Sequence, residues 1–152
     1  MSQRPVINLY TDGSSSGNPG PGGWGAVLCC GDLRKEMSGG YSLTTNNRME
    51  LLAVIKGLEA IRWRDAEVEV WSDSTYVVNT LTYGWKRKKN QDLWALYDRT
   101  ARGFRLKFHW IKGHAGHPEN ELCDRLATAA AALPGLPPDE GYMSDNQEVK
   151  LF

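Results

Sequence analysis

The order of strand and helix patterns along the chain is the feature that most constrains its fold. Strand patterns occur at residues 6–11, 24–30, 34–43, 67–72 and 105–111. Helical spacing of apolar residues occurs at residues 48–61, 74–82, 92–102 and 121–133. Consecutive strands joined by short turns run antiparallel, whereas strands joined through helices run parallel. We therefore expect an α/β protein with one five-stranded mixed sheet, in which three antiparallel strands are followed by two parallel strands, flanked by helices.

Length and composition fit one globular domain with a tail. The chain has 152 residues, of which 41% are apolar and 24% charged, which excludes a disordered, collagen-like or coiled-coil chain. We place the domain at residues 1–133 and a proline-containing tail at residues 134–152. No apolar run approaches a membrane span, and the N-terminus lacks an apolar signal region. Because the three cysteines show no metal-type spacing, we expect a cytoplasmic protein with reduced thiols and no membrane contact.

The formal net charge is zero, which argues against nucleic-acid binding through overall charge alone. The charge is nevertheless unevenly distributed. The tail carries four acids against one lysine, so the domain itself is net positive. Four basic residues are consecutive, namely Lys86, Arg87, Lys88 and Lys89.

Four acidic residues are expected to meet at one edge of the sheet. Asp12 and Asp73 follow the first and fourth predicted strands, and ligand sites in open α/β sheets gather at such strand ends. Glu50 and Asp124 are predicted in the first turns of two helices. Carboxylates converge in this way only where a cation offsets their repulsion, and ligand sets made of oxygen alone favour Mg²⁺ or Mn²⁺.

Each acid also has a structural interpretation. Asp12 precedes a glycine and is compatible with a turn, and Asn47 with Glu50 resembles a helix capping box. Asp73 suits an N-cap position, and Asp124 suits a helix dipole or an ion pair with its neighbour. Spacing alone does not separate these interpretations from a metal site.

Two glycine-containing segments are candidate loops at the same edge. Residues 11–25 contain six glycines and two prolines, so they form either a plain hairpin or a turn whose backbone amides face a phosphate or a sugar. No Gly-Lys-Ser/Thr follows, which excludes a Walker loop. Residues 112–124 hold two histidines. His114 is either inert or a group that transfers protons or assists product departure, whereas His117 before a proline is expected to fix the loop.

Four sequence segments occur together: TDGSSSGNPGPGGWG at residues 11–25, TTNNRMEL at 44–51, SDSTYV at 72–77 and KGHAGHPENELCDRLA at 112–127. They strongly resemble the cellular type 1 ribonuclease H of bacteria. The resemblance covers roughly residues 6–133, and its motifs are very specific. It implies the ribonuclease H-like fold, a mixed sheet with helices on both faces, in agreement with the order of elements expected from periodicity.

The resemblance implies an endoribonuclease that hydrolyses the RNA strand of RNA–DNA hybrids and leaves 5′-phosphate and 3′-hydroxyl ends. Members of this family use two Mg²⁺ ions, for which Mn²⁺ is a substitute, in an in-line displacement. By resemblance, Asp12 binds both ions. Asp73 and Asp124 bind the ion that activates water, and Glu50 binds the ion that stabilises the leaving oxygen.

The same resemblance implies further contacts. His114 matches a catalytic histidine on a mobile loop that helps the product leave, and Glu121 matches an auxiliary acid. Residues facing the RNA, whose 2′-hydroxyl distinguishes it from DNA, are Gly13, Ser14, Ser15, Asn18, Asn46 and Asn47. Asn18, Thr45 and Arg48 resemble the residues of a pocket that binds a phosphate of the DNA strand. Thr75 stands where the family has a glutamine, so one minor-groove contact is expected to be weaker.

The largest departure from the family lies between Tyr76 and Asp92. Many bacterial members place a helix and a long basic loop there, whereas this chain has only VVNTLTYGWKRKKNQ. In the family, that helix and loop bind the hybrid. We expect Trp85, Lys86, Lys88 and Lys89 to replace part of this binding surface. The alternatives are a solvated turn for the lysines and simple packing for the tryptophan.

We expect a monomer whose partner is an RNA–DNA hybrid. The ending from Gln147 to Phe152 loosely resembles short peptides that dock on sliding clamps, and packing against its own domain is the alternative. Two other functions remain open. A binding module that grips hybrids without cutting them is disfavoured by the presence of all four acids. A resolvase or integrase on the same fold is disfavoured by the glycine-rich and histidine segments.

Overall fold

The computed structural model of the chain describes residues 5–146. Its elements, in chain order, are β1 (Val6–Ser15), β2 (Gly20–Cys30), β3 (Leu33–Thr44), α1 (Asn46–Glu59), β4 (Glu67–Ser72), α2 (Thr75–Tyr83), α3 (Gln91–Ala101), β5 (Arg105–Trp110), α4 (Pro118–Ala131) and α5 (Glu140–Asn146). None of the helices in these described residues is long and apolar enough to cross a membrane.

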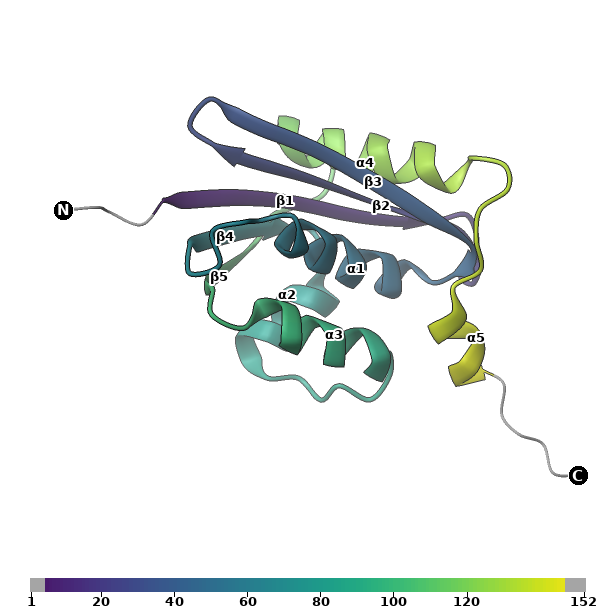
Figure 1. The fold of residues 1–152 in the computed structure, drawn as a ribbon. Coiled ribbons are helices and arrows are strands. Elements are labelled where there is room, and N and C mark those ends of the chain that lie inside the picture. The colour runs from purple at the N-terminus through teal and green to yellow at the C-terminus, as the bar shows by residue number, and fades with distance from the viewer. Residues whose placement is uncertain (1–4, 147–152) are drawn as a thin grey trace, which may run out of the picture.

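The five strands form one sheet in the order β3-β2-β1-β4-β5. β1 pairs antiparallel with β2, and β2 antiparallel with β3, whereas β4 runs parallel to β1 and β5 parallel to β4. Figure 1 shows α1, α2 and α3 on one face of this sheet and α4 on the opposite face. The mixed five-stranded architecture predicted from the sequence is thereby confirmed.

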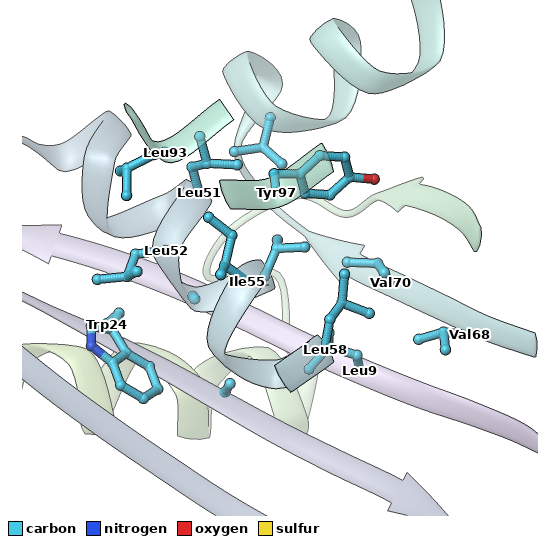
Figure 2. Close-up of a cluster of buried hydrophobic side chains, with 14 of the residues drawn as sticks. Leu9, Trp24, Leu51, Leu52, Ile55, Leu58, Val68, Val70, Leu93 and Tyr97 are labelled. Atoms are coloured by element: carbon cyan, nitrogen blue, oxygen red, sulfur yellow. The ribbon is translucent and has the colours of Figure 1, made fainter. Parts of the chain in front are cut away.

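The main hydrophobic core lies between the sheet and α1, with α3 covering α1 from the outside (Figure 2). It includes Leu51, Leu52, Ile55 and Leu58 of α1, Leu9, Val68 and Val70 of the sheet, and Leu93 and Tyr97 of α3. Shortening one such fully buried side chain to alanine costs about 2–5 kcal/mol of stability. Because α1 is packed on two sides, it is a rigid support for the acid near its N-terminus.

The glycine-rich segment forms a longer hairpin than the sequence indicated. β1 continues to Ser15 and β2 begins at Gly20, and the ladder between them runs as far as the pair Ser15 and Gly22. The turn is closed by a hydrogen bond from the Ser16 N–H to the Pro21 carbonyl, at 2.7 Å. The structure therefore shows a hairpin at residues 11–25. The interpretation in which backbone amides of this segment face a phosphate or a sugar stays a prediction.

The segment after residue 133, expected as a tail, is docked on the domain as far as the structure describes it. The Ser42 N–H donates to the Pro137 carbonyl at 2.9 Å. The Thr44 hydroxyl donates to Asp139 at 2.7 Å, and Asp139 is buried. Figure 1 shows α5 beyond the start of α1. The clamp-like ending at 147–152 lies outside the described residues.

Candidate active site

Two acids are placed side by side by the parallel pairing of β1 with β4. The ladder joins Thr11 to Ser72, so Asp12 and Asp73 come next to each other where β4 ends. Asp12 is buried and lies within β1 itself, opposite Gly25 of β2. Asp73 follows the end of β4 as expected. β1 instead continues past Asp12 to Ser15, so the prediction that Asp12 follows the end of its strand is wrong, although the pairing of β1 with β4 still brings the two acids together.

Glu50 reaches the same place from α1. The N-cap of α1 is Thr45, whose side-chain oxygen accepts a hydrogen bond from the Arg48 N–H at 3.3 Å. The Glu50 carboxylate instead accepts from the Gly13 N–H at 2.9 Å, the same N–H that contacts the Asp12 carboxylate at 2.9 Å. The capping-box interpretation of Glu50 is therefore wrong. A Cβ at Gly13 would overlap the backbone of Glu50, so only glycine permits this close approach of α1 to β1.

The structure also corrects the other capping interpretations. The N-cap of α2 is Ser74, whose side chain accepts from the Val77 N–H at 3.1 Å, so Asp73 does not cap this helix. α4 begins at Pro118, earlier than the predicted residue 121, because proline is well suited to a first helical turn. Asp124 therefore lies in the second turn of α4, too far from the helix start for a dipole contact to explain it.

The side chains of Asp12, Glu50 and Asp73 each offer a carboxylate oxygen, and these atoms all lie within 4.8 Å of one another. Asp124 and His114 line the same open cleft, which has a volume of about 400 Å³. We call this space, with these five residues, the acidic cleft. His114 is exposed on its rim with a positive φ of 57°, in the glycine-flanked loop before α4.

The electrostatics of the acidic cleft favour a cation. Burial, with the neighbouring charges of Asp73 and Asp124, raises the pKa of Asp12 to about 7. Complete burial and the charge of Asp12 raise the pKa of Glu50 well above its ordinary value, and burial also raises the pKa of Asp73. Oε2 of Glu50 is buried with no hydrogen-bond partner. Unpaired, crowded carboxylate oxygens of this kind fit hard divalent cations such as Mg²⁺ or Mn²⁺.

Several expected substrate contacts gather beside the acids. Gly13, Ser14, Asn46 and Asn47 line the acidic cleft, as does Thr75. Ser15 lies further along β1 and lines a separate hollow against the C-terminal end of α4. Glu121, expected as an auxiliary acid, lies in the first turn of α4 and is not among the lining residues of the cleft.

A second, polar pocket of about 470 Å³ adjoins the cleft through Asn47. Its lining includes the expected residues Asn18, Thr45, Lys88 and Lys89, and we call it the Lys88 pocket. The Asn18 side chain accepts from the Asn46 N–H at 3.0 Å, which ties the β1–β2 turn to the start of α1. Trp85 and Lys86 are exposed but do not line this pocket.

Arg48 was expected to contact a phosphate of the DNA strand, but its side chain is buried in ion pairs instead. It is 1% exposed, and its guanidinium donates to Asp139 at 2.8 and 3.0 Å and to Asp92 at 2.7 and 2.8 Å. A buried guanidinium with two carboxylate partners is not available to a phosphate. Its contribution to the Lys88 pocket is structural, because it joins α1 to the start of α3 and to the C-terminal segment.

Sequence reasoning missed several lining residues. Ser74 and Tyr76 belong to the acidic cleft, and their position directly after Asp73 was an available signal. Asn90 and Gln91 follow the basic run and line the Lys88 pocket. Two further residues of that pocket, Tyr142 and Asp145, come from α5, and nothing in their local sequence indicates this place.

The comparisons with known proteins agree with this geometry. The RNase H family model matches residues 4–132. A ribonuclease H from Bradyrhizobium sp. (strain ORS 278) is 48% identical over 146 residues, which cover 88% of this chain and 94% of that protein.

Solved structures give the same result. LC9-RNase H1, described as a type 1 RNase H with the type 2 active-site motif, matches with a TM-score of 0.76 and 32% identity over 86% of this chain and 74% of that one. LC11-RNase H1, solved in complex with an RNA/DNA hybrid, matches with a TM-score of 0.66 and 28% identity over 82% of this chain and 96% of that one. This chain belongs to the ribonuclease H family and is a nuclease.

Proposed function

We propose that this protein hydrolyses the RNA strand of RNA–DNA hybrids, leaving 5′-phosphate and 3′-hydroxyl ends, with two Mg²⁺ ions that Mn²⁺ can replace. The observation that carries the proposal is the convergence of Asp12, Glu50 and Asp73 within 4.8 Å, with Asp124 on the same cleft. The hybrid found in complex with LC11-RNase H1 supports the choice of substrate.

The acids have different roles because they have different positions. Asp12 is assigned to both ions, because it shares the Gly13 N–H with Glu50 and lies next to Asp73 through the pairing of β1 with β4. Glu50 is assigned to one ion, and Asp73 with Asp124 to the other. Bound divalent ions supply Lewis acidity for an in-line displacement at phosphorus.

His114 is assigned to proton transfer and product departure. It is exposed and lines the acidic cleft, a position that suits proton transfer between solvent and a substrate bound in the cleft. Burial raises the pKa of Asp73, and the nearby imidazole of His114 opposes this rise.

The hybrid is held on both strands. Gly13, Ser14, Asn46 and Asn47 line the cleft where the RNA strand lies, and they offer amide, hydroxyl and backbone groups to its 2′-hydroxyls. The Lys88 pocket is assigned to a phosphate of the DNA strand, because its lysines and amides are donors. Ser15, Trp85 and Lys86 are assigned to more distant backbone contacts.

We also propose that the protein acts as a monomer in the cytoplasm. The proposed clamp contact depends on the ending at residues 147–152. A pull-down with a sliding clamp that gives the same result for the full chain and for a chain lacking this ending would remove the clamp contact from the proposal.

The test is cleavage of an end-labelled RNA–DNA hybrid with Mg²⁺, with duplex RNA and duplex DNA as control substrates. Asp12→Asn removes the central charge at nearly constant shape, and Glu119→Gln is the matched control on α4, because Glu119 pairs with Arg34 outside the cleft. We expect the wild type and Glu119→Gln to cut only the RNA strand of the hybrid, and Asp12→Asn to cut nothing. A wild type that binds the hybrid without cutting it would replace this proposal with a binding module.

A further inference from the structure

The Lys88 pocket is built from segments that lie far apart in the chain. Asn18 comes from the β1–β2 turn, and Thr45 and Asn47 come from the start of α1. Lys88 and Lys89 come from the loop between α2 and α3. These side chains are neutral donors and cations, a composition that suits a phosphodiester.

The remaining wall of the pocket is supplied by the C-terminal helix α5. Tyr142 and Asp145 are three residues apart on this helix, so they share one of its faces, and both line the pocket. Among the described residues that line the pocket, Asp145 is the only acid. A carboxylate beside two lysines and beside the position of a phosphate competes with that phosphate for the lysines.

The position of α5 is fixed by a buried ionic cluster. Asp139, directly before the helix, accepts from Arg48 at 2.8 and 3.0 Å and from the Thr44 hydroxyl at 2.7 Å. Arg48 also binds Asp92 near the start of α3. A Cβ at Gly141 would overlap the Asp92 carboxylate, so the glycine lets α5 approach this cluster closely.

The same cluster removes Arg48 as a source of charge for the pocket. Its guanidinium is buried against two carboxylates, so the positive charge that the pocket offers comes from Lys88 and Lys89. Because the described residues that line the pocket include two exposed cations, one added carboxylate has a large relative effect on the local potential.

We propose that α5 is a wall of the hybrid-binding surface and that Asp145 on this wall weakens the grip of the Lys88 pocket on a phosphate of the DNA strand. This inference rests on the proposed function, because it assigns the pocket to the DNA strand of a hybrid. The consequence is a pocket that releases its phosphate readily. Asp145 is thus a residue that determines affinity, although it lies outside the domain boundary expected from the sequence.

The test compares Asp145→Asn with Glu140→Gln in the full chain. Glu140 is an exposed acid on the same helix that faces the neighbouring hollow against Arg48 and does not line the Lys88 pocket. Each substitution removes one negative charge, so the two variants differ only in the position of the lost charge. Binding of a fluorescent RNA–DNA hybrid is measured by anisotropy across a range of KCl, in the Asp12→Asn background so that no cleavage interferes.

We expect Asp145→Asn to tighten hybrid binding about threefold to fivefold at low salt, with the gain shrinking as salt rises, because a partly exposed charge pair is screened. Glu140→Gln is expected to change the affinity less than twofold. In a background of Lys88→Gln with Lys89→Gln, the gain from Asp145→Asn should fall, since the cations on which Asp145 acts are gone.

Equal effects of the two acid substitutions, or none, would overturn the inference in favour of a general charge effect or an inert helix. An absence of measurable binding by every variant would overturn it as well. The proposed function is scored separately, by cleavage of the same hybrid by the wild type with Mg²⁺. A wild type that cuts the hybrid while Asp145→Asn binds unchanged would leave the nuclease intact and remove only the role of α5.

Discussion

The acidic cleft and the Lys88 pocket share Asn47 but are built in opposite ways. The cleft places its buried acids on two paired strands and on a helix that is packed on both sides. The pocket is assembled from a turn, a helix start, a loop and the docked C-terminal helix. In the cleft, three carboxylates lie with oxygens within 4.8 Å of one another, an arrangement that favours a bound cation. Beside the pocket, the buried guanidinium of Arg48 is paired with Asp92 and Asp139, so the charges that contact a ligand are exposed ones.

The largest expected effect separates function from stability in the cleft. Asp12→Asn should lower the rate of hybrid cleavage by at least about three orders of magnitude, because it removes the carboxylate that we propose binds both ions. Without metal at pH 8, the same substitution should raise the free energy of unfolding by ~2 kcal/mol, because it removes a buried charge. Urea denaturation in EDTA checks the second result. A variant that is both inactive and less stable would mean that Asp12 supports the fold rather than a cation.

The second effect has the opposite sign and lies beside the pocket. Asp139→Asn leaves the buried Arg48 with one carboxylate partner among the described residues, Asp92, whose side chain is 41% exposed, so it should cost about 3 kcal/mol of stability. Asp92→Asn is the matched control, and it should cost less because solvent already screens that pair. Urea denaturation at pH 7 measures both. Equal costs for the two substitutions would contradict the central place of Asp139.

This difference between the regions also explains what the sequence could predict. Asp12, Glu50, Asp73 and Asp124 stand in local motifs next to predicted strand ends and helix starts, so their meeting followed from topology. Arg48 stands in such a motif too, and the motif alone does not show that its side chain is already paired. Its partner Asp139 is 91 residues away, and only tertiary packing brings them together.

The same reason accounts for the wall of the Lys88 pocket. The segment after residue 133 has prolines and acids, which are typical of a solvated tail. It docks because Asp139 binds Arg48 and Thr44. No periodicity or residue spacing in the sequence indicates this interaction. Asp145 reaches the pocket only as a consequence of that docking. Long-range ionic contacts of this kind are thus the part of the site that pattern analysis does not reach.

The third prediction concerns the exposed charges of the pocket. Replacing both Lys88 and Lys89 with glutamine should weaken hybrid binding about tenfold and lower the slope of log affinity against log salt by up to about two, since each phosphate contact contributes about one. Lys86→Gln is the comparison, because Lys86 lies in the same basic run but outside the pocket, and its more distant contact should change the slope by less than about one. Binding isotherms at several KCl concentrations measure the slope. A slope that falls as much for Lys86→Gln would show that the run acts as diffuse charge.

The smallest expected effect is a difference in how the two regions respond to pH. Burial raises the folded-state pKa of Asp12 to about 7 and also raises that of Glu50, so the folded protein retains protons that the unfolded chain has lost. Stability in EDTA should therefore fall as pH rises from about 4 to about 7, the window between the unfolded and folded values. Hydrogen bonding to Arg48 lowers the pKa of Asp92, so its contribution is present above its ordinary value and is lost as pH falls through the lowered one.

Thermal unfolding from pH 3 to pH 8 in EDTA should accordingly show a maximum near pH 4. The alkaline decline comes from the acidic cleft and the acid decline from the Arg48 cluster. Mg²⁺ should raise the melting temperature more at pH 8 than at pH 5, because protons compete with the ion for the same oxygens. Asp12→Asn should flatten only the alkaline side, and Asp92→Asn only the acid side. A melting temperature that rises steadily from pH 5 to pH 8 without metal would mean that the cleft acids are not held close together, and the contrast between the two regions would be lost.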